Sequence, residues 1–125
     1  MKLWDAIQLH ARKNHWEAII FNVNDIDTVR GILRQLDDSP ISWGVTNLPK
    51  MLSQTPKFVY DAMQREINEF GSIGIEVQVR RHDICWWSID EAPSKRIVDY
   101  HTFACTYNIS EFNISEDSWR RLMEG

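Results

Sequence analysis

The feature that most constrains the fold is the recurrence of apolar residues at every second position from 73 to 79. The apolar members fall at every second position and are Ile73, Ile75, Val77 and Val79. The polar members between them are Glu76, Gln78 and Arg80. Period two places the two sets on opposite faces of a β-strand. The segment therefore predicts a half-buried strand with its polar face toward water.

Two further segments of β composition follow this strand. Residues 84–89 are apolar at both parities apart from Ser88, which is typical of a strand covered on both sides. Residues 90–95 combine charges with Pro93 and predict a loop, because proline cannot donate to a β-ladder. Residues 96–107 then resume β composition. Together the three segments predict an antiparallel three-strand meander.

Hydrophobic periodicity predicts helices over residues 2–14, 24–36 and 55–70, and a short final helix over 116–124. Asn24 and Thr55 are the expected N-caps, and Gly71 is the expected C-terminal glycine. Residues 16–23 and 41–47 predict two more strands. The order indicates one α+β domain over residues 1–125. Its single mixed or antiparallel sheet ends in the meander and is packed by about four helices.

Composition and charge restrict the class of partner. The chain has 125 residues, 43% of them hydrophobic, and a formal net charge of -4. An acidic balance disfavours a protein that coats nucleic acid and favours a protein partner with a basic surface. The N-terminus lacks the apolar core of a signal peptide, and no apolar segment reaches the length of a membrane span. We therefore expect a cytoplasmic protein.

No cofactor or nucleophile motif is present in the sequence. Cys85 and Cys105 have no zinc-type spacing, so free buried thiols are expected, with a cross-strand disulfide as the alternative. There is no Gly-rich phosphate loop, no dinucleotide fingerprint and no Gly-x-Ser-x-Gly sequence. We expect no cofactor and no resident metal.

One cluster of histidines and carboxylates defines an enzymatic alternative. It consists of His82, Asp83, Asp99 and His101. If the last two strands of the meander pair, these side chains meet in some registers, where they would suit a metal-dependent hydrolase. The competing interpretation, which we favour, is that His82 and Asp83 form a turn and that Asp99 and His101 face outward on an edge strand.

Tryptophans and acidic residues are the candidates for partner binding. Tryptophan is enriched at interface hot spots, and most of the six are expected in the core. Trp87, beside Trp86 in a strand, and Trp43, in an irregular segment, are the two that we expect on a binding surface. Acidic residues flank the second helix at both ends and predict a negative patch; they are Asp25, Asp27, Asp37 and Asp38.

Basic pairs occur at Arg80–Arg81 and at Lys95–Arg96. In a meander they fall at opposite ends of the middle of its three strands, so we do not expect one basic surface. Binding of nucleic acid would require Arg80, Arg81 and Arg96 on one surface beside an exposed tryptophan.

These features together favour a small, non-enzymatic, acidic protein-binding module. By class analogy it suits a stoichiometric inhibitor of the toxin-immunity or phage-encoded anti-defence type, acting on a basic site of a larger protein.

Overall fold

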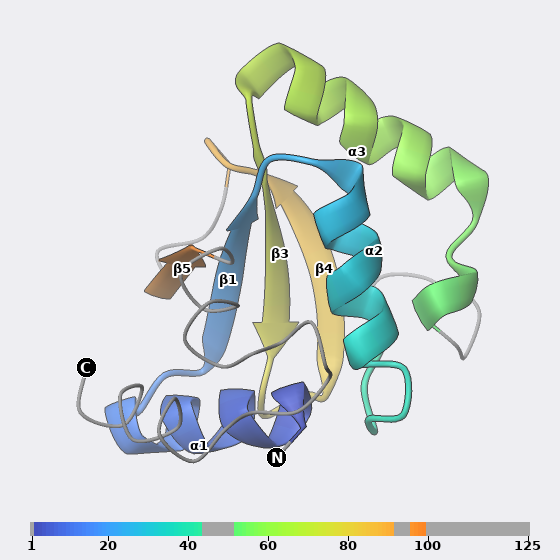
Figure 1. Cartoon of the computed structure of the whole chain (residues 1–125). Helices are drawn as coiled ribbons and strands as arrows, with labels where there is room; N and C mark the ends of the chain where they lie inside the picture. Colours follow the sequence, from blue (N-terminus) through green and yellow to red (C-terminus); the bar gives the residue numbers. More distant parts are fainter. Residues whose placement is uncertain (1, 44–51, 92–95, 100–125) are drawn as a thin grey trace.

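The computed structural model describes residues 2–43, 52–91 and 96–99, which form one five-stranded mixed sheet with three α-helices (Figure 1). The helices are α1 (Leu3–Asn14), α2 (Ile26–Gln35) and α3 (Lys57–Phe70), with a 3-10 turn η1 (Leu52–Gln54). The strands are β1 (Ala18–Val23), β2 (Ser42–Trp43), β3 (Ile73–Gln78), β4 (Asp83–Ser88) and β5 (Arg96–Asp99). The α+β class is confirmed. The predicted helix over 116–124 lies outside the described residues.

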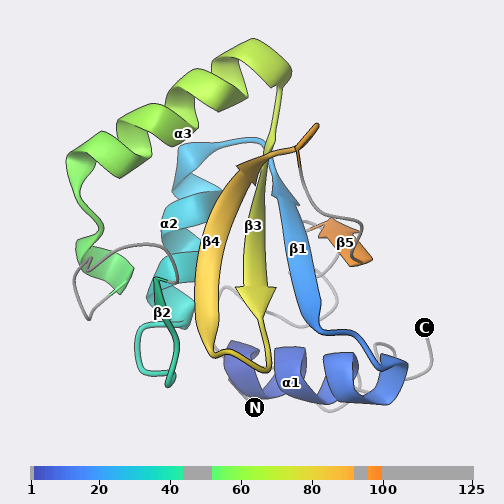
Figure 2. The same ribbon diagram turned by 180° about the vertical axis from the view of Figure 1, so that it is seen from behind.

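The strand order is β2-β4-β3-β1-β5. β3 pairs antiparallel with both β1 and β4, whereas β5 pairs parallel with β1. The predicted meander is therefore right for the β3–β4 hairpin and wrong for its third strand. The second edge of β4 is taken by β2, so β5 adds to the remaining edge of β1. Figure 2 shows β2 and β5 at opposite edges of the sheet.

The core lies between one face of the sheet and the three helices. Its strand residues include Ile19, Phe21, Ile75 and Val77, all fully buried. The opposite face of β3 is buried as well. Glu76 is 1% exposed and Gln78 is 9% exposed. The prediction that these two side chains face water is wrong, because Glu76 and Gln78 form a hydrogen-bonded group with Cys85 and Trp87 of β4 on this face.

Helix termini follow the predicted chemistry with two corrections. Asp25, one residue after the expected cap, accepts a hydrogen bond from the Thr28 backbone N–H at 2.7 Å. Thr55 does not cap α3. Its hydroxyl donates to the Leu52 carbonyl at 2.5 Å instead. Gly71 ends α3 with φ 86°, a left-handed conformation that glycine adopts at little cost, as predicted.

The helices α1 and α3 lie at opposite ends of the sheet (Figure 1). α1 leads directly into β1 and sits below the strand ends, whereas α3 leads into β3 from the other end. The T-shaped contact between Trp4 and His82, with ring centroids 5.5 Å apart, holds the β3–β4 turn against α1. The connections at the two ends carry the charged residues considered next.

Candidate functional site

The parallel pairing of β5 brings distant arginines to one end of the sheet. Arg96 is aligned with Ile19, while the neighbouring Ala18 is aligned with Gln78, just before Arg80. Adjacent strands lie about 4.8 Å apart, so the backbone at Arg96 is roughly 10 Å across the sheet from β3. The expectation that these arginines occupy opposite ends of a strand is wrong, because it rested on the antiparallel meander.

We call this surface the basic end, formed by Arg12, Lys13, Arg80, Arg81 and Arg96. The first two lie in the last turn of α1, where the helix dipole favours cations. Arg81 pairs with Asp83 at 3.4 Å. Across residues 2–43, 52–91 and 96–99, no carboxylate lies within ion-pair distance of Arg12 or Arg80. Within these residues the two guanidinium groups carry uncompensated positive charge.

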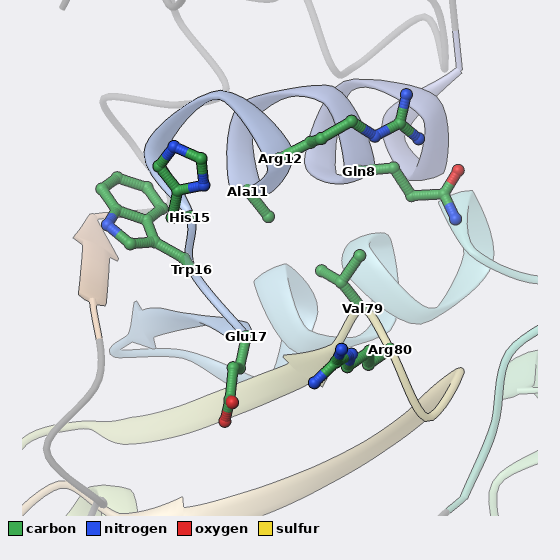
Figure 3. A pocket seen from close by; sticks show the side chains of 8 residues that line it. All are labelled: Gln8, Ala11, Arg12, His15, Trp16, Glu17, Val79 and Arg80. Atoms are coloured by element: carbon green, nitrogen blue, oxygen red, sulfur yellow. The ribbon is translucent and has the colours of Figure 1, made fainter.

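A pocket of about 510 Å³ opens at the basic end between α1 and the sheet (Figure 3). It is lined by Gln8, Ala11, Arg12, His15, Trp16, Glu17, Val79 and Arg80. Figure 3 shows Ala11 and Val79 pointing toward each other from its two walls. Gln8 and Arg12 lie toward one side of it, and His15 and Trp16 toward the other. The pocket thus combines an apolar middle with charged and aromatic margins.

Backbone hydrogen bonds fix both walls of this pocket. α1 ends at His15, which adopts a left-handed conformation with φ 57°. The Trp16 N–H then bonds back to the Ala11 carbonyl at 2.8 Å. On the sheet side, the Val79 N–H donates to the Glu17 carbonyl at 3.0 Å. The connection from α1 to β1 is therefore tied to the helix and to the end of β3.

Trp16 is held by two neighbours and remains half-buried. His10 meets its ring edge-on, with centroids 4.6 Å apart. The Arg96 guanidinium carbon lies 5.4 Å from the ring centroid, within the range of a cation–π contact. Trp16 was expected within a strand, not beside a pocket. A tryptophan immediately after a helix that ends in Arg12 and Lys13 was the available sequence signal.

The other end of the sheet carries acidic residues, and we call it the acidic end. It comprises Asp25, Asp27, Glu69, Asp90 and Glu91, together with Phe70. In the described connections 24–25, 71–72 and 89–91, the first turn of α2 and the last turn of α3, there is no lysine or arginine. Phe70 is 44% exposed. It is the last residue of α3.

The predicted partner-binding residues are not gathered on one surface. Asp25 and Asp27 lie exposed at the acidic end. Asp37 and Asp38 follow the other end of α2, roughly 15 Å along the helix. Trp43 is 6% exposed and belongs to the core, so it is not presented to a partner. The predicted patch around the second helix is therefore split.

Asp38 is already paired with Lys2 at an exposed position. The hydrogen bond from Lys2 lowers the pKa of Asp38 and raises the pKa of the lysine. A second, smaller pocket of about 310 Å³ lies here, lined by Lys2, Arg34, Gln35, Asp37 and Asp38. Because its charges include both signs at close range, it offers no net attraction to a partner of either charge.

Trp87 has a structural role. Its indole N–H donates to the buried carboxylate of Glu76, which also accepts from the Gln78 amide at 2.7 Å and the Cys85 thiol at 3.1 Å. Burial, followed by the hydrogen bond to Glu76, raises the pKa of Cys85 to about 12. The free thiol stays protonated at neutral pH and is a poor nucleophile. Cys105 lies outside the described residues.

In the enzymatic alternative, Asp83 and Asp99 should lie close together, but the structure places them far apart. Asp83 begins β4 at the basic end, whereas Asp99 closes β5 beside Asn22 at the opposite end of the sheet. Three strand spacings, roughly 14 Å, also separate the two strands. His82 is in a turn against Trp4, and His101 lies outside the described residues. No group of metal-binding side chains occurs in the part of the chain that the structure describes.

Comparisons of the chain with protein families, with curated proteins and with solved structures gave no match. None of the described helices is long and apolar enough to cross a membrane.

Proposed function

We propose that this protein is a non-enzymatic protein-binding module that engages a basic surface of a larger protein through its acidic end. The observation that carries the proposal is the half-exposed phenyl ring of Phe70 at the sheet end that bears Asp25, Asp27, Glu69, Asp90 and Glu91. An aromatic anchor within a polar, charged margin is the usual composition of a protein interface.

The charges and the ring would contribute differently to such a complex. The negative charges of the carboxylates steer a basic partner toward this end and accelerate association at low ionic strength. Burial of the exposed part of Phe70 supplies the apolar free energy that slows dissociation. The complex is therefore expected to form faster at low salt and to depend on Phe70 for its lifetime.

The internal use of the reactive groups supports a binding role over a catalytic one. Glu76 accepts hydrogen bonds within the sheet, Cys85 is held protonated, and Asp83 pairs with Arg81. Size and acidic charge match stoichiometric inhibitors of the toxin-immunity or anti-defence type, which is an analogy of class. On that proposal the partner's basic functional site is covered by the acidic end.

Affinity capture from host lysate tests this proposal with two charge-matched variants. Asp90→Asn/Glu91→Gln changes the acidic end, and Asp5→Asn/Asp38→Asn removes the same charge elsewhere. We expect one partner in one-to-one stoichiometry by native mass spectrometry, lost in the first variant and in Phe70→Ser but retained in the second. Equal capture by all variants would refute the acidic end as the interface.

A further inference from the structure

We propose that the pocket at the basic end binds a nucleotide unit, an aromatic base joined to a phosphate. The site is distinct from the acidic end and lies at the opposite end of the sheet, so it goes beyond the proposed protein interface. The same unit occurs in a free nucleotide and in single-stranded nucleic acid, and the experiment below separates the two sources.

We assign phosphate recognition to Arg12 and Arg80, whose guanidinium groups lie on the helix side and the sheet side of the pocket in Figure 3. Arg12 comes from α1 and Arg80 from the β3–β4 connection, so two elements supply cations to one cavity. Neither has a carboxylate within ion-pair distance in the described parts of the chain. Guanidinium groups match phosphate oxygens in geometry as well as charge. Lys13 and Arg96, which do not line the pocket, add positive charge at the same end of the sheet.

The base is recognised by the apolar middle and the aromatic margin of the pocket. Ala11 and Val79 face each other across it, and the half-buried Trp16 closes one side (Figure 3). Base contacts with aromatic side chains are a main source of affinity in single-strand binding proteins. A volume of about 510 Å³ lies within the usual range of small-ligand sites.

Glu17 favours a nucleotide over an acidic peptide as the ligand of this pocket. It is the one carboxylate among the residues that line the pocket, and it is exposed on the sheet side of it. A carboxylate repels a polyanion whose side chains carry no hydrogen-bond donor, such as polyglutamate. It accepts hydrogen bonds from the exocyclic amino group of a base, as acidic side chains do from cytosine N4. A pocket with both arginines and this carboxylate therefore suits a ligand with both a phosphate and an amino-bearing base.

Fluorescence anisotropy with labelled oligo(dC) and oligo(dT) of about ten nucleotides tests the proposal on the full chain. We expect oligo(dC) to bind about fivefold more tightly than oligo(dT), because only cytosine donates an amino group to Glu17. Glu17→Gln should abolish that preference. Arg12→Gln and Arg80→Gln should each weaken both ligands and reduce the slope of log affinity against log salt by about one.

Arg65→Gln is the matched control, because Arg65 is exposed on α3 at the other end of the molecule. It removes the same charge and should leave binding unchanged, while thermal unfolding confirms that every variant is folded. If free CMP displaces the labelled oligonucleotide completely, the site binds mononucleotides. If only unlabelled oligonucleotide displaces it, the site binds single strands.

Three results would overturn the proposal. They are absence of oligonucleotide binding at low salt, equal weakening by Arg65→Gln and Arg80→Gln, and tighter binding of polyglutamate than of oligo(dC). None of these results bears on the acidic end. The capture experiment with the Asp90→Asn/Glu91→Gln variant remains a separate test of the protein interface.

Discussion

The two ends of the sheet are both built from connections between helices and strands. They differ in the charge of their side chains and in whether those side chains line a pocket or lie exposed on the surface. At the basic end, the connection after α1 is tied by hydrogen bonds to the helix and to β3, and it shapes a pocket. At the acidic end, Phe70 is 44% exposed at the end of α3, and the other connections at this end carry carboxylates. A net charge of -4 is therefore compatible with two oppositely charged surfaces on one small domain.

The centre of the sheet lies between the two ends. A substitution there should have the largest effect on the free energy of unfolding. Glu76→Ala leaves the indole N–H of Trp87 and the amide of Gln78 without their buried acceptor. We expect the free energy of unfolding to fall by about 3 kcal/mol, measured by urea denaturation. Glu76→Gln keeps a carbonyl acceptor and should lose less than half as much.

Glu91→Ala is the exposed control for that measurement and should stay within about 0.5 kcal/mol of the wild type. Comparable midpoints and slopes for Glu76→Ala and wild type would show that Glu76 does not organise the sheet between the two ends.

The thiol of Cys85 reports on the same central network through its chemistry. Because its pKa is raised from 9.0 to about 12, alkylation by iodoacetamide at pH 8.5 should be at least about tenfold slower than in the unfolded chain. The free energy of unfolding should also decrease as pH rises above 9.0, since only the unfolded thiol then ionises. Peptide mapping by mass spectrometry measures the rate at Cys85 alone. Equal rates in the folded and unfolded chain would contradict the burial of this group.

Asp25 separates a structural role from a binding role at the acidic end. As the N-cap of α2, its carboxylate accepts from the Thr28 N–H and hydroxyl. Asp25→Ala should cost about 1 kcal/mol of stability, whereas Asp25→Asn keeps a capping oxygen and should cost a few tenths. Asn at this position should still weaken partner capture, because the charge is gone. If Asn and Ala destabilise equally, the cap is not the source of the effect.

The smallest effect is expected where opposite charges already pair in water. Asp38→Asn breaks the contact with Lys2, but exposed ion pairs contribute little because solvent screens them. Its thermal midpoint should match that of wild type, and capture of the partner should not change. A clear loss of capture in this variant would return Asp38 to the interface and blur the distinction between the two ends.

Local sequence patterns predicted most of the helices and strands. They did not predict which strands are neighbours in the sheet. The periodicity of residues 57–70 and the alternation of residues 73–78 identified α3 and β3, and Gly71 marked the boundary between them. Alternation shows which side chains share a face, but it does not specify which strand is the neighbour. The assignment of β5 to β4 instead of β1 followed from that gap, and it separated Arg96 from Arg80.

The burial of the candidate tryptophans could not be predicted for the same physical reason, although Trp87 remains partly exposed. Trp43 and Trp87 were singled out by residue type, but burial depends on the tertiary neighbours: Trp43 joins the core and Trp87 bonds to Glu76. Asp25 and Asp27 were correctly placed on the surface, since a charged residue at a helix start rarely has another place. Trp16 and Phe70 required the fold, because their exposure depends on where α1 and α3 end.

The parallel pairing of β5 with β1 alone brings Arg96 to the basic end. Methyl and aromatic NOE spectroscopy on a chain labelled at Ile, Val and Phe tests it directly. The parallel register predicts contacts from Ile97 to Ile20 and from Val98 to Phe21. Contacts from Ile97 or Val98 to Trp86 or Trp87 of β4 would instead establish the meander, and Arg96 would no longer belong to the basic end.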